Sequence, residues 1–203
     1  MESLVLAMGT EPSVCGDARL LLGRVLRSHG VSAMITEVEA YDGPRDPASH
    51  AYTRTPRSAT IYGPEMRLYV YQIHGHHCAN VVTSPEGEGS AVLIRAGRIV
   101  DGVDLAHQRR QAMVDDDLLG RGPGNLAKAL GITKADLGTD LTVDDGVHLG
   151  PHLEHPTTIC SGPRVGVRLF ADEPWRFWID GEPSVSVYRR HPKAGTTRTG
   201  PAD

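Results

Sequence analysis

The chain has 203 residues, of which 39% are hydrophobic and 23% are charged. This length and composition are typical of a globular domain that buries a substantial core. There is no uninterrupted apolar run of about 18 residues, so we expect no membrane-spanning helix. The N-terminus also lacks the basic lead and cleavage site of a secretion signal. A formal net charge of −4 excludes a surface that is basic throughout, so a nucleic-acid-binding protein of this composition must concentrate its positive charge on one face.

The cysteines and the C-terminal composition set the domain organisation that we expect. Cys15, Cys78 and Cys160 are widely spaced and odd in number, which favours reduced, intracellular thiols over a disulfide framework. Residues 191–203 are polar and rich in Gly, Pro and Thr, which predicts a flexible tail. Residues 1–190 are predicted to form one domain.

The first regular elements are predicted to be a helix and a long strand. Apolar residues recur at helical spacing over 18–28, after Asp17, which we expect to cap the helix. β-branched residues over 31–41 predict a strand, and the prolines and glycine that follow predict a loop over 42–50. Because side chains alternate along a strand, we expect one face to carry Ile35, Glu37, Glu39 and Tyr41.

Further strands dominate the remainder of the chain. We predict strands at 68–73, 77–83 and 90–96, and shorter ones at 140–143, 164–169, 176–179 and 184–188. Helices are predicted over 101–113, capped by Asp101, and over 122–132, opened by Pro123 and ended by Gly131. Many strands, few helices and hairpin-like spacing predict an α+β (mixed α/β) fold, a single domain with a curved, mostly antiparallel sheet and surrounding helices.

Glu37 and Glu39 form the first candidate site. Two carboxylates on one strand face repel each other unless they are solvated or paired with a cation. The pair is therefore either a solvated strand edge or a general base placed beside an aromatic wall, Tyr41. In the second case the loop that runs on to His50 would complete a pocket.

A second candidate is the sequence HGHHC. Its His74, His76, His77 and Cys78 are of the residue types that bind zinc. However, adjacent residues on a strand point to opposite faces, and no second cluster lies at ligand spacing. We expect packed or DNA-facing histidines rather than a metal site.

Aromatic and basic residues concentrate in one region of the chain. Tyr69 and Tyr71 share a strand face, either as a core-lining ladder or as a stacking wall for a planar ligand. The second interpretation gains weight because most tyrosines fall nearby: Tyr41, Tyr52, Tyr62, Tyr69 and Tyr71. Basic residues that could hold phosphates follow the same region: Arg54, Arg57, Arg67, Arg95, Arg98, Arg109 and Arg110. The helix in GPGNLAKALG could also present backbone N–H groups to a phosphate, although this signal is weak by itself.

Several dispersed segments, taken in order, resemble the alkyladenine (3-methyladenine) DNA glycosylase family. The resemblance spans roughly residues 18–187 and implies a fold like the C-terminal domain of formyltransferases. It implies a monofunctional DNA glycosylase of base excision repair, which flips out alkylated or deaminated purines and hydrolyses the N-glycosidic bond. The segments are EVEAYDGPRDPASHAYTRTPRS, LYVYQIHGHHCANVV, AVLIRA, GPGNLAKALGI and PRVGV–PWRFWIDGEPSVS.

The resemblance also implies roles for individual residues. Glu39 matches the carboxylate that activates water, and Arg95 and the main chain at Val165 match the groups that hold this water. The base-binding positions, which sandwich the flipped base, contact its edge or exclude normal guanine, are Tyr41, Ala48, His50, Tyr71 and Asn80.

The hairpin tip departs from the family pattern. The family usually has a tyrosine wedge where this chain has His74, and the chain is one residue shorter beyond Gly75. A histidine still stacks and carries charge near phosphates, but it is a smaller plug. We expect Arg54, Arg57 and Arg67 to contact the DNA backbone.

The expected partner is double-stranded DNA that contains damaged purines, with no membrane and no metal or organic cofactor. The expected acting form is a monomer in the cytoplasm, associated with the nucleoid. Three alternatives remain: a damage sensor that binds without cutting, a zinc-dependent hydrolase built on HGHHC, and a domain that shares the fold without DNA activity.

Overall fold

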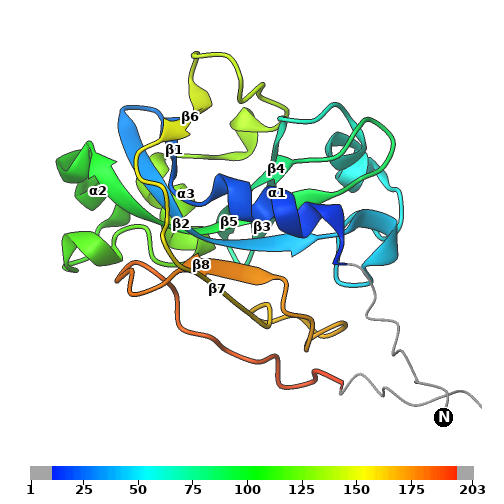
Figure 1. Cartoon of the computed structure of the whole chain (residues 1–203). Helices are drawn as coiled ribbons and strands as arrows, with labels where there is room; N and C mark the ends of the chain where they lie inside the picture. Colours follow the sequence, from blue (N-terminus) through cyan, green and yellow to red (C-terminus); the bar gives the residue numbers. More distant parts are fainter. Residues whose placement is uncertain (1–10, 196–203) are drawn as a thin grey trace, which may run out of the picture.

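An eight-stranded antiparallel sheet forms the centre of the structure, a computed structural model that describes residues 11–195 (Figure 1). Six strands follow the order β3-β4-β5-β2-β1-β6, and β8 pairs with both β2 and β7. The strands are β1 (Arg24–Ser28), β2 (Val31–Tyr41), β3 (Leu68–Ile73), β4 (His76–Val82), β5 (Ala91–Asp101), β6 (Val147–His152), β7 (Ile159–Gly162) and β8 (Arg176–Ile179). The helices are α1 (Ser13–Leu21), α2 (Val103–Arg110) and α3 (Pro123–Leu130), with short 3-10 helices at Gly43–Arg45, Pro56–Tyr62, Asp116–Leu118 and Lys134–Asp136.

Strand β2 pairs with three other strands of the sheet. One of its edges pairs with β5. Its other edge is shared, because residues 31–34 pair with β1 and residues 37–39 pair with β8. The second half of β2 therefore lies between two neighbours, and Glu37 and Glu39 are fully buried there.

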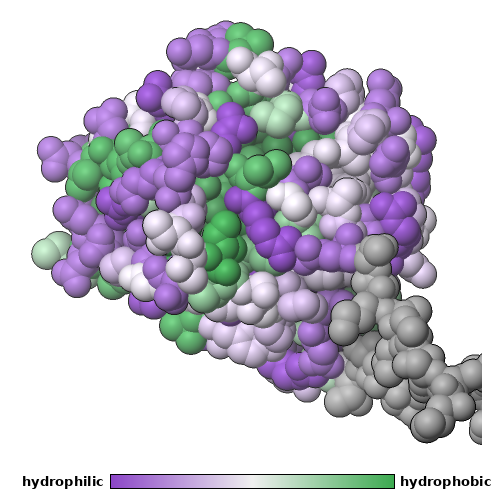
Figure 2. All heavy atoms as spheres, in the orientation of Figure 1, coloured by the Kyte–Doolittle hydropathy of each residue, from purple (hydrophilic) through white to green (hydrophobic). Residues whose placement is uncertain are grey.

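The two faces of the sheet are covered differently. On one face α1 and α3 pack their apolar stripes into the main core; α1 contributes Val14, Cys15, Ala18 and Leu21. Helix α3 begins at Pro123 and ends at Leu130, and the residue that follows, Gly131, has a positive φ of 73° that suits a helix C-terminus. A second, smaller cluster joins β3 to the loop region over 51–62. Figure 2 shows separate hydrophobic patches among hydrophilic side chains on the outside.

The first predicted helix is wrong in its bounds. Helix α1 ends at Leu21, and residues 24–28 form β1, which pairs with β2 and β6. Gly23 separates the two elements, because its φ of 81° and a carbonyl 2.1 Å from any added Cβ suit a turn rather than a helix. Asp17 lies inside α1, so it is not the cap, and Pro12 is the residue before the helix.

Other boundaries also differ from the sequence prediction. The segments 140–143, 164–169 and 184–188 are not strands, while β6 and β7 were not predicted. The backbone N–H groups of Val165 and Ser186 donate to buried carboxylates rather than to a strand ladder. Helix α2 is shorter than predicted, and Gly102 rather than Asp101 precedes it.

Ile35 is not on the face that carries Glu37 and Glu39. The register of β2 against β5 shifts between Ile35 and Glu37 and again between Glu37 and Val38, as it does at a β-bulge. A bulge adds one residue to a strand and so reverses its alternation. Ile35 consequently packs in the main core with Val38.

The predicted fold class is confirmed: a single domain of mixed α+β structure with a curled antiparallel sheet. The likeness to formyltransferases stays a prediction. Of the predicted tail, residues 196–203 lie outside the described residues, and residues 191–195 form no helix or strand. All helices found within residues 11–195 are too short or too polar to span a bilayer.

Candidate active site

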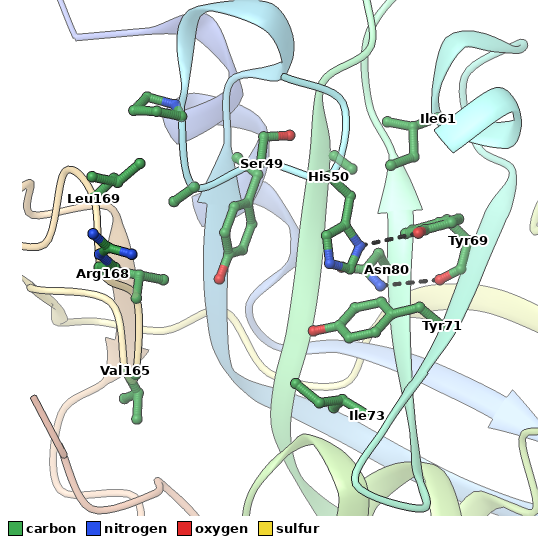
Figure 3. A pocket seen from close by; sticks show the side chains of 16 residues that line it. Ser49, His50, Ile61, Tyr69, Tyr71, Ile73, Asn80, Val165, Arg168 and Leu169 are labelled. Carbon is green, nitrogen blue, oxygen red and sulfur yellow. Dashed lines mark hydrogen bonds between the residues drawn. The ribbon is translucent and has the colours of Figure 1, made fainter. Parts of the chain in front are cut away.

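A cavity of about 380 Å³ opens on the sheet face away from α1 and α3 (Figure 3). A volume in this range suits a small planar ligand. Its wall is built by the end of β2, the loop over 47–50, strands β3 and β4, the first residue of β5, residue 61 and residues 165–169. The lining residues include Tyr41, Ala48, His50, Tyr69, Tyr71, Asn80, Val165 and Arg168.

Aromatic rings form one wall of the cavity. Tyr69 and Tyr71 alternate onto the same face of β3, as predicted, and their ring centroids lie 5.9 Å apart. The His50 ring meets the Tyr71 ring edge-on at 4.5 Å. Behind them, the side-chain amide of Asn80 donates to the Tyr69 carbonyl at 3.0 Å, which fixes the amide at the cavity wall. Tyr69 is buried in the smaller cluster, as a core-lining residue is, while Tyr71 is partly open to the cavity, and its stacking role stays a prediction.

Glu39 lies directly behind the cavity surface. Its Oε1 accepts the backbone N–H of Val165 at 2.7 Å, and its Oε2 accepts the hydroxyl of Tyr41 at 2.9 Å. Arg95 adds a cation 3.5 Å from Oε1. Tyr41 and Val165 both line the cavity, so the carboxylate is one layer from its interior.

Glu37 has a different set of partners. Its two oxygens accept from Arg176 at 3.0 Å, from the Ser186 backbone at 2.7 Å and from the Ser186 hydroxyl at 3.0 Å, and Arg95 lies 3.1 Å away. A carboxylate has about four acceptor positions, and Glu37 has four protein contacts, three of them on Oε1. Glu39 has three, of which the contact to Arg95 is long at 3.5 Å, so one acceptor position is left for a water molecule. Repulsion between the two carboxylates is offset by the shared Arg95, not by solvent.

Tyr41 is held as a hydrogen-bond donor. Burial and the neighbouring Glu39 charge raise the pKa of Tyr41 well above its usual range, against the opposing effect of the Arg164 cation. A protonated hydroxyl donates to Glu39 and helps to fix the orientation of its carboxylate.

His50 is neutral at physiological pH. Burial and the positive charge of Arg57 lower the pKa of His50 to about 4. The Arg57 guanidinium, which only donates, lies 3.3 Å from Nε2. The proton of the neutral ring is therefore on Nδ1, which donates to the Tyr69 hydroxyl at 3.0 Å. A neutral ring does not repel a cationic ligand in the cavity.

The lowered pKa of His50 predicts a pH dependence of stability. Between pH 6.5 and about 4 the unfolded chain binds a proton at this position that the folded chain does not bind, so stability falls as the pH falls. We expect His50→Gln to show a smaller drop in Tm than the wild type between pH 7 and pH 4.5. Thermal unfolding followed by circular dichroism tests this, and parallel Tm curves for the two proteins would contradict it.

The predicted backbone-contacting arginines are not equivalent. Arg57 lies at the rim, with its guanidinium 5.8 Å from the centre of the Tyr71 ring, and Arg54 lies 4.9 Å from the centre of the Tyr62 ring. Arg67 pairs with Asp140 at 3.2 Å and does not line the cavity. Arg168 lines the opposite side, in Figure 3 next to Leu169, and it was not singled out from the sequence.

The side chains of the HGHHC segment lie in different environments around the tight hairpin between β3 and β4. Ile73 pairs with His76, so His74 and Gly75 form a two-residue turn, both with positive φ. His74 is exposed at the tip, as a wedge requires, whereas Cys78 is buried. Among residues 11–195 there is no group of three His, Cys, Asp or Glu side chains placed to hold a metal ion.

The structure also adds residues that the sequence did not indicate. Asp46 accepts the Ala48 N–H at 2.9 Å, so a base contact from this loop must use another group. Arg164 and Asp46 form an ion pair whose side chains are fully buried. Arginine and aspartate are ordinarily exposed, so neither type signals a buried role. Their only sequence signal is position, next to Val165 and inside the loop that leads to His50.

Comparisons with known proteins agree with this geometry. Residues 10–183 match the methylpurine-DNA glycosylase family. Relatives from Mycobacterium sp. (strain KMS), Mycolicibacterium paratuberculosis and Nocardia farcinica are 49%, 50% and 48% identical, and their names give 3-methyladenine DNA glycosylase as a provisional activity. Each alignment covers 87% of this chain and 90%, 89% and 88% of the relative, respectively. The chain belongs to the methylpurine-DNA glycosylase family, whose members are hydrolases that act on DNA.

Proposed function

We propose that the chain is a monofunctional DNA glycosylase that flips a damaged purine nucleotide into the cavity and hydrolyses its N-glycosidic bond. The observation that carries the proposal is the position of Glu39, a buried carboxylate that still has capacity for water behind an aromatic-walled cavity. The proposed substrates are alkylated or deaminated purines in double-stranded DNA, of the 3-methyladenine, hypoxanthine and ethenoadenine class. The acting form is proposed to be a monomer inside the cell, at the nucleoid.

The chemistry follows from the groups around the cavity. Glu39 takes a proton from a water molecule whose oxygen attacks C1′ of the sugar, and the electron pair of the broken C1′–N bond leaves with the base. A positioned general base contributes roughly 10²–10⁴-fold. The carboxylate also stabilises the positive charge that develops on the sugar. A cationic base leaves as a neutral purine, whereas a neutral base needs a proton as it leaves.

The walls supply affinity for the flipped base. Extruding a nucleotide costs a few kcal/mol, and less for a damaged or mispaired one. Stacking on Tyr41, His50 and Tyr71 would return about 1–3 kcal/mol per aromatic contact. A cationic base gains further from the tyrosine faces.

The product is proposed to be an abasic site without strand cleavage. Cleavage by β-elimination requires an amine that forms a Schiff base with the sugar. Within the part of the chain that the structure describes, no lysine lines the cavity.

One experiment tests the whole proposal. Labelled duplexes that contain hypoxanthine or ethenoadenine are incubated with wild type or Glu39→Gln, with and without EDTA, and then heated in alkali. We expect strand breaks that need alkali and Glu39 and that persist in EDTA. Breaks without alkali would contradict a monofunctional enzyme, and loss in EDTA would indicate a metal-dependent hydrolase. Lesion-selective binding without breaks would indicate a damage sensor.

The hairpin tip gives a separate prediction. His74 is proposed to fill the space that the flipped base leaves, so His74→Ala should weaken binding to a lesion duplex by about 1–3 kcal/mol, the value of one base–aromatic stack. His74→Tyr, with a larger ring, should bind more tightly than wild type. Fluorescence anisotropy measures both, with His155→Ala as the control because this exposed histidine lies beyond β6, at the sheet edge opposite β3. Equal affinities for all four proteins would exclude the wedge.

A further inference from the structure

Arg164 is a buried side chain that joins separate parts of the cavity wall. Its guanidinium donates to the Ala40 carbonyl at 3.0 Å and pairs with Asp46 through both terminal nitrogens, Nη2 at 3.1 Å from Oδ1. It lies between two aromatic rings, 4.7 Å from the centre of Tyr41 and 4.9 Å from the centre of Trp175. One guanidinium therefore contacts the end of β2 and the loop over 42–50.

These contacts reach the groups that hold the base and the water. Asp46 uses Oδ1 to accept the Ala48 N–H, so the loop that lines the cavity is tied to Arg164 through one carboxylate. On the other side, Val165 follows Arg164 directly and donates its N–H to Glu39. The ion pair thus lies between the base-binding loop and the peptide that orients the catalytic carboxylate.

The sheet itself does not fix this peptide. Residues 163–170 lie outside the strands. Three backbone hydrogen bonds of this segment are described for residues 11–195. Two join it to the C-terminal segment, from Gly166 N–H to Arg189 and from Gly195 N–H to Arg168, and the third is local, from Glu173 N–H to Phe170. Its links to β2 are the side chains of Glu39 and Arg164. Removal of the Arg164 fork would leave one described hydrogen bond between this segment and β2, from the Val165 N–H to Glu39.

The chemistry of the Arg164–Asp46 pair indicates a role in positioning other groups rather than in stabilising the fold. A buried ion pair rarely stabilises a protein more than apolar residues of equal volume would, because both charges lose their hydration. A guanidinium that bonds a carboxylate with two nitrogens does, however, fix direction as well as distance. A site that must place a leaving base and an attacking water on opposite sides of one carbon atom needs such a constraint.

We infer that Arg164 and Asp46 are positioning residues, which lock the base-binding loop to the Val165 peptide and so align the flipped base with the water that Glu39 activates. This inference rests on the proposed function. Misplacement of reacting groups by about 1 Å costs on the order of 10²-fold in rate, so the expected effect is on the chemical step.

The test uses Arg164→Lys, Asp46→Glu and the double variant of the full-length chain. Lysine is shorter and glutamate is longer, so the double variant spans the same gap with an ion pair. Single-turnover excision from a hypoxanthine duplex is measured at saturating enzyme, at a temperature where circular dichroism shows every variant folded. Affinity for a duplex with a tetrahydrofuran abasic-site analogue is measured in parallel, because this ligand has no base to align. Leu26→Ala, buried in β1 outside the cavity lining, is the control for lost stability.

We expect each single variant to lose at least tenfold in the excision rate, with the analogue affinity within threefold of wild type. The double variant should recover part of the loss, because a Lys–Glu pair restores the link but not the two-nitrogen fork, and Leu26→Ala should keep the wild-type rate despite a lower Tm. Wild-type rates in the folded single variants would overturn the inference, as would a double variant no faster than either single one. A wild-type protein that excises no base would instead overturn the proposed function, and the inference with it.

Discussion

Glu39→Gln is expected to slow single-turnover excision from a hypoxanthine duplex by about 10²–10⁴-fold, the contribution of a positioned general base. The fold should be retained, because the amide has the same size and its oxygen can still accept the Val165 N–H, now at 2.7 Å. Arg95 keeps its ion pair with Glu37 at 3.1 Å. The variant loses the group that takes the proton, the negative charge and the long ionic contact to Arg95 at 3.5 Å.

A matched control separates this effect from a general loss of charge. Glu154 is an exposed glutamate whose carboxylate pairs with Arg98 at 2.6 Å, so Glu154→Gln also removes one carboxylate from an ion pair. Rapid-quench time courses should show wild-type rates for Glu154→Gln. A Glu39→Gln protein within threefold of wild type would rule out Glu39 as the general base.

Arg95→Met is expected to lower the free energy of unfolding by about 3–5 kcal/mol and to abolish most excision. The Arg95 side chain is only 11% exposed and is the cation shared by two carboxylates with no exposed surface. Removal of one member of a buried ion pair leaves its partner charged and poorly solvated, which accounts for that range. Glu37 keeps Arg176 at 3.0 Å, whereas Glu39 keeps only the hydrogen bonds from Val165 and Tyr41.

The neighbouring Arg98 on β5 provides the comparison. Its side chain is 31% exposed, and it pairs with Glu154, 58% exposed, at 2.6 Å and with Glu182 at the longer distance of 3.5 Å, so Arg98→Met removes mainly a surface ion pair. Such pairs contribute about 0–1 kcal/mol. Urea denaturation of both variants measures the difference. Equal losses would show that the buried carboxylates do not depend on Arg95.

Local patterns in the sequence predicted much of the sheet. Alternation along 68–73 placed Tyr69 and Tyr71 together, and the structure confirms it. The helix predicted over 18–28 was wrong in its second half, because a short apolar run fits both a helix and a strand. Pairing with β2 and β6 makes residues 24–28 a strand. The prediction that Ile35 shares a face with Glu37 was wrong for a related reason. Alternation with a period of two gives no sign of an inserted residue.

Some residues of the candidate site were indicated before the structure, and others were found only in it. The resemblance indicated Glu39, Tyr41, His50, Tyr71, Asn80 and Val165, and the structure brings all six to one cavity or directly behind it, although their roles stay predictions. It did not indicate Asp46 and Arg164, whose ion pair joins residues 118 positions apart. The strand pattern alone did not distinguish Glu37 from Glu39, which share a strand face and a residue type, and only the resemblance indicated Glu39.

The sequence by itself determined the local periodicities, the fold class and, through its ordered motifs, the family. Those properties depend on neighbouring residues or on residue types at a given spacing. Only the tertiary structure gave Glu37 more partners than Glu39, because Ser186, 149 positions away, donates two hydrogen bonds to Glu37, whereas Val165, 126 positions away, donates one to Glu39. Hydrogen bonds and burial of this kind depend on three-dimensional contact, and a single sequence carries no local sign of which distant residues will meet.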